Sequence, residues 1–195
     1  MAPQSSLLSV PCSCPTLELT VPSSPSQFKK LLAPGKISQT LCLGNLTDKS
    51  TYEYLRSITP DLKIVKGRYD VEATSLPLTQ VVSHGALRIG FLEGFTLVSG
   101  EPDLLLAEAN RLDVDVLCWG GTHRFDAFEY MDKFFVNPGS ATGAFTGGEG
   151  EVVPSFCLMD VSCNAPFLLQ SGVRRYHECY GGLERGGFVL RVDEC

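Results

Sequence analysis

The sequence predicts one α/β domain built on a mixed β-sheet, and its composition and two recurring patterns support this fold class. The chain has 195 residues, of which 44% are hydrophobic and 19% are charged, a composition typical of a folded domain. Apolar runs of about four to eight residues recur and end in glycine with polar neighbours, as buried strands do. Segments with helical spacing lie between some of these runs. A length of about 200 residues fits a single domain.

The N-terminal segment, residues 1–27, is rich in serine and proline. The spacing of its prolines excludes a helix and leaves room only for a short strand. We therefore expect this segment to be loosely ordered or packed at the periphery, and we assign residues 28–195 to a single domain. Ser26 is a candidate N-cap for a short helix over residues 27–32.

The rest of the chain alternates between strand and helix signals. A helix is predicted after the first strand, with Tyr52, Leu55 and Ile58 on one side. His84 and Gly85 form a hairpin signal between two strands, which makes the sheet mixed. A second helix is predicted over about residues 101–112. The predicted strands cover residues 40–43, 62–65, 81–83, 87–92, 114–118, 133–136, 154–161 and 187–192.

The charge of the chain argues against nucleic-acid binding. The formal net charge is −6 and the sequence pI is about 5.1, so the chain lacks the basic field that attracts phosphate backbones. No apolar run approaches the roughly 18–20 residues that span a bilayer. We expect a soluble intracellular protein that does not bind nucleic acid.

The cysteines do not form a zinc or disulfide pattern. The eight cysteines contain no paired Cys-x-x-Cys motifs of the zinc-finger kind. Cys42, Cys118 and Cys157 each lie inside an apolar run, where a thiol acts as a small core hydrophobe. We therefore expect reduced cysteines and disfavour a redox or zinc module.

Polar residues follow several predicted strands, at the points where those strands end. Because loops at the carboxyl ends of strands converge on one edge of an α/β sheet, these residues are candidates for a common site. Glycine and polar residues also follow strands that carry no site, so their identity must decide. The candidates are Asn45, residues 68–70, Glu93 with Gly94, Thr122 with His123, and residues 137–140.

The order of these motifs resembles the ligand motifs of the calcineurin-like metallophosphoesterases. The matching strings are Gly44-Asn45, Gly67-Arg68-Tyr69-Asp70, Glu93-Gly94-Phe95 and Gly120-Gly121-Thr122-His123. In that family, carboxylate, Asn and His ligands from several loops hold two metal ions that activate water. The resemblance implies a four-layer α/β/β/α sandwich of the metallophosphoesterase type.

A closer resemblance covers about residues 27–160 and is to the phosphoesterase-fold subunit of retromer, an endosomal sorting coat. It is carried by residues 27–37, 122–129, 135–144 and 154–160. It implies a scaffold subunit that binds the C-terminal end of retromer's α-solenoid subunit and supports endosome-to-Golgi retrieval. Further partners would be other retromer and sorting-nexin components. The protein would be cytoplasmic and recruited to the cytosolic face of endosomes, contacting the membrane only indirectly.

The chain departs from the hydrolase pattern at most ligand positions. The opening Asp-x-His pair has no counterpart in residues 1–27. Asn45 replaces a bridging Asp, Arg68 replaces an Asn, and Glu93 and Gly121 replace His. A permanent Arg68 cation beside a dication costs Coulomb energy. The vestigial metal-site positions are Asn45, Arg68, Asp70, Glu93, Gly121 and His123.

From these departures we expect no catalytic residue, no cofactor and no tightly bound metal, with weak or vestigial binding of a divalent metal left open. The alternative is a metal-dependent phosphoesterase with a reduced metal site. Asn45 could instead satisfy backbone groups in a tight turn, and Glu93 could form an ion pair with Arg68. His123 could be a structural histidine or a weak metal ligand.

A short apolar stretch after Gly94 is the candidate partner-binding segment. It contains Phe95, Leu97 and Val98, residues that a hydrolase has little reason to expose beside its phosphate site. Apolar surface with a polar rim commonly marks a protein interface. The alternative is that these residues fold back onto the helix that begins near Glu101.

Overall fold

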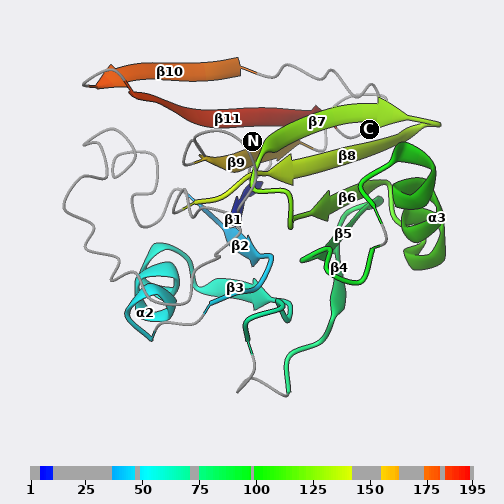
Figure 1. Ribbon diagram of the computed structural model, residues 1–195, viewed down its shortest axis with the longest axis horizontal. Coiled ribbons are helices and arrows are strands. Elements are labelled where there is room, and N and C mark those ends of the chain that lie inside the picture. The colour runs from blue at the N-terminus through cyan, green and yellow to red at the C-terminus, as the bar shows by residue number, and fades with distance from the viewer. Residues whose placement is uncertain are drawn as a thin grey trace.

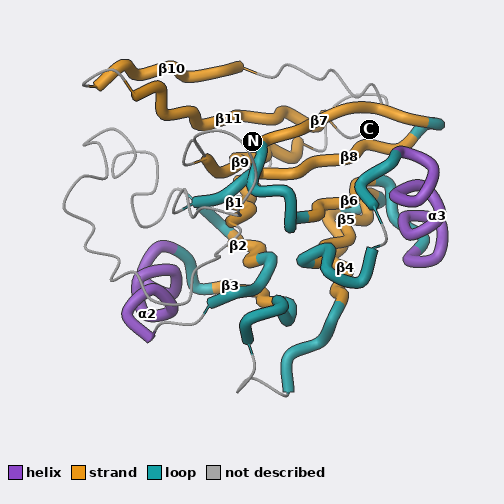
Figure 2. Tube along the Cα trace, in the orientation of Figure 1, coloured by secondary structure: helices purple, strands orange, loops and turns teal. Residues whose placement is uncertain are grey.

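The computed structural model describes residues 5–10, 37–46, 49–70, 75–97, 99–141, 155–162, 174–180 and 183–193. Two β-sheets form the body of the described part of the molecule, and Figure 2 shows the two described helices on opposite sides of the strands. No helix in the described ranges is long and apolar enough to cross a membrane. The elements are β1 (Ser5–Val10), β2 (Gln39–Cys42), α2 (Lys49–Ile58), β3 (Asp61–Ile64), β4 (Thr79–His84), β5 (Leu87–Leu92), α3 (Pro102–Leu112), β6 (Val116–Trp119), β7 (Phe125–Tyr130), β8 (Lys133–Pro138), β9 (Ser155–Ser162), β10 (Arg174–Tyr180) and β11 (Leu183–Asp193).

Both sheets are mixed, as the hairpin signal predicted. The six-stranded sheet has the order β10-β11-β9-β1-β2-β3, and the five-stranded sheet has the order β4-β5-β6-β8-β7 (Figure 1). Strands β1, β2 and β3 are parallel, as are β5, β6 and β8. Because parallel strands end on the same edge, the loops that follow them meet there. This topology positions the candidate site.

Three apolar clusters show that the molecule has four layers. The cluster between the sheets joins β2, β5, β6, β8 and β9 through residues such as Leu41, Phe91 and Met159. A second cluster packs Leu55 and Ile58 of α2 on the outer face of the six-stranded sheet, and a third packs α3 on the five-stranded sheet. The predicted α/β/β/α sandwich is confirmed.

Strand β1 corrects the expectation for the N-terminal segment. Residues 5–10 pair with β2 on one side and β9 on the other, inside the six-stranded sheet. The prediction of loose or peripheral packing is therefore wrong for these residues. The physical reason is that this run contains no proline, whereas the prolines that discouraged a strand lie outside it. The predicted helix over residues 27–32 lies outside the described residues, and the division at residue 27 stays a prediction.

Two details of the secondary structure also differ from the prediction. Helix α2 buries Thr51 with Leu55 and Ile58, while Tyr52 is 37% exposed and its ring lies under the Arg56 guanidinium. The buried face is thus turned by one residue from the predicted one. Strand β7 was not predicted, because it lies at the edge of the sheet and its sequence mixes aromatic and charged residues without a continuous apolar run.

The three cysteines of the apolar runs are free and buried, as predicted. Burial raises the pKa of the Cys118 thiol to about 12. Burial, and then the neighbouring Cys118, raise the pKa of the Cys157 thiol as well. Both thiols therefore stay protonated near neutral pH and serve as small core side chains.

The position of β1 predicts the effect of a proline within it. Every backbone N–H of a strand with two neighbours can join a ladder, so Leu8→Pro removes a donor inside the sheet. We expect a loss of roughly 1–3 kcal/mol in the free energy of unfolding, measured by chemical denaturation. Leu8→Val keeps the N–H and is the matched control. Unchanged stability of the proline variant, together with fast amide exchange over residues 6–10, would contradict the placement of β1.

Candidate functional site

The site is built around Asn45, which lies in the loop after β2 and is buried. Its side-chain Nδ2 donates to Glu93 Oε1 at 2.9 Å, and its Oδ1 accepts from the backbone N–H of Tyr69 at 2.9 Å. Its φ of 59° is left-handed, a conformation that Asn adopts more readily than most residues. One amide side chain thus links the loops after β2, β3 and β5.

Asp70 fastens the loop after β3 to the loop after β2. Its buried Oδ2 accepts from the backbone N–H of Gly67 at 2.8 Å and from that of Asn45 at 2.7 Å. A carboxylate that accepts two N–H bonds is well satisfied without a cation. Asp70 therefore holds the backbone of the two loops together.

Glu93 connects the remaining loops. Oε1 of its buried carboxylate accepts from Asn45, and Oε2 accepts from the backbone N–H of Phe95 at 2.8 Å. Its main-chain oxygen accepts from Gly120 N at 3.1 Å, which ties the loop after β5 to the loop after β6. Each carboxylate oxygen of Glu93 consequently has a hydrogen-bond donor from the protein.

The glycines of the first two motifs allow the loops to touch backbone to backbone. A Cβ on Gly67 would lie 2.3 Å from Asn45 N, and a Cβ on Gly44 would lie 2.4 Å from Gly67 N. Atoms cannot approach so closely, so only glycine fits at either position. The contact brings Asn45 and Asp70 within hydrogen-bond reach of each other's loop.

The remaining candidate positions are Arg68, Gly121 and His123. Arg68 is exposed, and among the described residues none forms an ion pair with it. The suggested Arg68–Glu93 pair is therefore wrong, because Glu93 bonds to Asn45 and Phe95 N instead. Gly121 is exposed, and His123 is half-buried; both have positive φ.

The candidate partner-binding residues have different environments. Phe95 is half-buried. Leu97 is half-buried and packs against the cluster that contains Leu105 of α3, which agrees with the alternative that this stretch folds back. Val98 lies outside the described residues.

The end of β8 and the turn after it are tied to the loop that carries Thr122. Asn137 is fully buried; its Nδ2 donates to Thr122 Oγ1 and its Oδ1 accepts from Gly139 N, both at 3.0 Å. Gly139 has a φ of 83°, and a Cβ there would lie 2.0 Å from Ser155 Oγ. The predicted turn with a left-handed glycine is confirmed.

The donor set does not fit the two-metal centre of a hydrolase. Such a centre needs free carboxylate, Asn and His ligands that converge on two ions. Here the Asn45 amide and the Asp70 and Glu93 carboxylates are engaged with protein donors and acceptors, and Gly121 supplies no side-chain donor. Within the described part of the chain, no group of three or more His, Cys, Asp or Glu side chains is placed to hold a metal.

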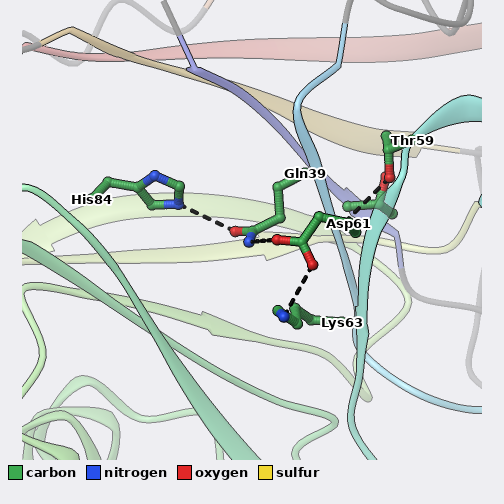
Figure 3. Close-up of polar contacts among 6 residues, drawn as sticks. Gln39, Thr59, Asp61, Lys63 and His84 are labelled. Carbon is green, nitrogen blue, oxygen red and sulfur yellow. Dashed lines mark hydrogen bonds and ion pairs between the residues drawn. The ribbon is translucent and has the colours of Figure 1, made fainter.

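A second polar cluster, which sequence reasoning missed, lies at the amino ends of β2 and β3 (Figure 3). Gln39 Nε2 donates to the Asp61 carboxylate, and Gln39 Oε1 lies 3.1 Å from His84 Nε2. Lys63 Nζ is 3.0 Å from Asp61 Oδ1. The hydrogen bond from Gln39, and then the charge of Lys63, lower the pKa of Asp61 although burial opposes them.

This cluster joins the two sheets. Gln39 and Asp61 belong to the six-stranded sheet, whereas His84 ends the edge strand β4 of the other sheet. Because Gln39 donates to a carboxylate, its oxygen faces His84, so His84 Nε2 must carry the proton. Gln39 is separated by 22 residues from Asp61 and by 45 residues from His84. None of the three follows a glycine motif, so no local signal could have identified the cluster.

Known proteins resemble the chain in sequence. A family profile described as the calcineurin-like phosphoesterase superfamily domain matches residues 23–164. The vacuolar protein sorting-associated protein 29 of Schizosaccharomyces pombe is 46% identical over 145 residues, which cover 72% of this chain and 77% of that protein.

Solved structures show the same relationship. The crystal structure of Chaetomium thermophilum Vps29 has a TM-score of 0.73 and 74% identity, covering 80% of this chain and 82% of that chain. The zinc complex of wild-type Vps29 from Entamoeba histolytica has a TM-score of 0.74 and 30% identity, covering 95% of this chain and 98% of that chain.

The Asn45 network predicts a penalty for restoring a carboxylate. In Asn45→Asp, a carboxylate faces Glu93 where an amide donated, which leaves buried acceptors unpaired and like charges adjacent. We expect a loss of roughly 1–3 kcal/mol in unfolding free energy at pH 7, measured with EDTA present. Asp also tolerates a left-handed φ, so the backbone is not the cause.

The pH dependence and a second substitution check this account. The paired carboxylates share a proton, so one folded-state pKa rises above its unfolded value of about 4. The loss of unfolding free energy relative to wild type should be small below about pH 4 and should grow as the pH rises through the raised pKa. Adding Glu93→Gln supplies a donor and should recover most of the loss. If Asn45→Asp alone were as stable as wild type at pH 7, the stabilising role of the Asn45 network would be refuted.

Proposed function

The chain belongs to the calcineurin-like phosphoesterase superfamily and, within it, to the Vps29 family of vacuolar protein sorting proteins, and from this premise we propose that it is a non-catalytic subunit of retromer. The observation that carries the proposal is the Asn45 network. Ligand positions that would serve catalysis are engaged in joining loops. Loops that are joined in this way form a preformed surface that a protein partner can recognise.

The partner is the C-terminal end of retromer's α-solenoid subunit, and through it the other retromer and sorting-nexin components. This assembly recruits the chain to the cytosolic face of endosomes, where it supports endosome-to-Golgi and vacuolar protein retrieval. The acidic balance of the chain supports indirect membrane contact, because a net charge of −6 is not attracted to anionic lipid.

The docking face is the rim of the former metal site, with Phe95, Leu97 and Val98 at its apolar side. Phe95 and Leu97 keep part of their surface open to solvent, and the loop that carries them is anchored through Glu93. Anchoring lowers the entropy that a partner must remove on binding. Val98 is the proposed anchor residue.

A metal-dependent phosphoesterase is the competing function. It is favoured by the zinc complex of the Entamoeba histolytica relative. The engaged side chains of Asn45, Asp70 and Glu93 argue against it in this chain. We therefore assign no catalytic residue and no catalytic metal.

Co-purification tests the proposal. The native protein, captured from its own cells, should bring down a retromer α-solenoid subunit identified by mass spectrometry. Val98→Asp should weaken that association roughly 10- to 100-fold, since burial of a valine is worth about 1.5–3 kcal/mol. The melting temperature of the free subunit should stay nearly unchanged.

The matched control is Val81→Asp, because Val81 is 37% exposed on β4. It should bind like wild type. Absence of a retromer solenoid from the captured material would remove the main support for the proposal. Unfolding of the Val98→Asp protein would assign Val98 to the core, and intact binding would place the docking surface elsewhere.

A further inference from the structure

The turn between β3 and β4 displays two exposed side chains on the rim of the former metal site. Arg68 is exposed, and Tyr69 is 46% exposed, which makes it one of the most exposed large hydrophobic side chains in the described part of the protein. The Arg68 guanidinium forms no ion pair with any described residue. Within the described part of the chain, neither of these two side chains has an evident role in holding the fold.

The backbone that carries these side chains is fixed at several points. Gly67 N donates to Asp70 Oδ2 at 2.8 Å, and Asp70 N donates to Gly67 O at 3.3 Å, so the turn is closed on itself. Tyr69 N donates to Asn45 Oδ1 at 2.9 Å, which ties the turn to the neighbouring loop. The anchoring side chains of Asn45 and Asp70 are buried.

A fixed turn with open Arg and Tyr side chains has the properties of a recognition element. Binding then orders only the two side chains, because the backbone is already ordered. Arg and Tyr are the residue types that recur where alanine substitution costs most at interfaces. A guanidinium also matches a carboxylate through two parallel hydrogen bonds.

We propose that Arg68 and Tyr69 together recognise an acidic side chain on the retromer α-solenoid subunit. Arg68 pairs with the carboxylate, and Tyr69 packs against its aliphatic stem and the surrounding helix surface. This inference rests on the proposed function, since it names how that partner is recognised. A carboxylate is favoured because Arg68 is an exposed cation on a chain with a net charge of −6. The Arg68 cation attracts an acidic surface, whereas the net charge of the protein repels one.

The inference gives the former ligand positions a new task. Asn45 and Asp70 act as positioning residues, because their side chains accept hydrogen bonds from the backbone of the turn that carries Arg68 and Tyr69. The conversion of the metal site and the presentation of a binding pair are then two results of one hydrogen-bond network.

Charge reversal tests the proposal in the full-length protein. Binding to the purified solenoid subunit should weaken about 30-fold or more in Arg68→Glu and less in Arg68→Lys, which keeps the charge but loses the planar fork. Tyr69→Ala should weaken binding about tenfold. Arg56→Glu makes the same charge change on α2, in a different layer, and should bind like wild type. The variants at Arg68 and Tyr69 should melt near the wild-type temperature, because both side chains are exposed.

A compensating reversal on the partner completes the test. One Asp or Glu→Lys substitution in the C-terminal helices of the solenoid should restore binding to Arg68→Glu while weakening binding to wild type. If wild type itself does not bind the solenoid, the proposed function fails. If Val98→Asp blocks binding but Arg68→Glu binds like wild type, only the present inference is overturned. Equal loss in Arg68→Glu and Arg56→Glu would also overturn it, since the effect would then be one of net charge.

Discussion

The amide side chain of Asn45 is the interaction on which the arrangement of the site depends. Two buried carboxylates, Asp70 and Glu93, lie close to this residue, and buried carboxylates are costly unless cations or hydrogen-bond donors satisfy them. A hydrolase uses metal ions for this purpose. Here Asn45 supplies its backbone N–H to one carboxylate and its side-chain N–H to the other, so the loops are held in place by neutral donors.

The four-layer fold brings together the loops that these hydrogen bonds join. Parallel strands in each sheet deliver the loops to one edge, and glycines at 44 and 67 let the two first loops touch. At the opposite edge, Gln39 joins Asp61 to His84 and holds the sheets together there. The loops that carry Asn45, Asp70 and Glu93 are therefore held together by hydrogen bonds within the protein, and such an arrangement favours a role in which a partner recognises a preformed surface.

Most of the fold, and the grouping of the site, could be predicted from the sequence. Apolar runs that end in glycine located most of the strands, and the family resemblance supplied the layers. Strand β1 was missed because nearby prolines outweighed a short run whose partners, β2 and β9, are distant in sequence. The rule that loops at the carboxyl ends of strands meet at one edge of a sheet correctly predicted that Asn45, Asp70 and Glu93 lie together. The partner of Glu93 was predicted wrongly, because the direction in which Arg68 points depends on turn geometry that side-chain type does not encode.

We propose that hydrogen bonds take the place of metal ions in this site, and thermal melting with added metal tests this proposal most directly. A ligand that binds only the folded state raises the melting temperature by mass action. We predict that Zn²⁺ or Mn²⁺ in large excess leaves the melting temperature of the EDTA-treated protein unchanged and that dialysed protein retains far less than one metal per chain. A rise of several degrees, with two ions retained per chain, would contradict the account.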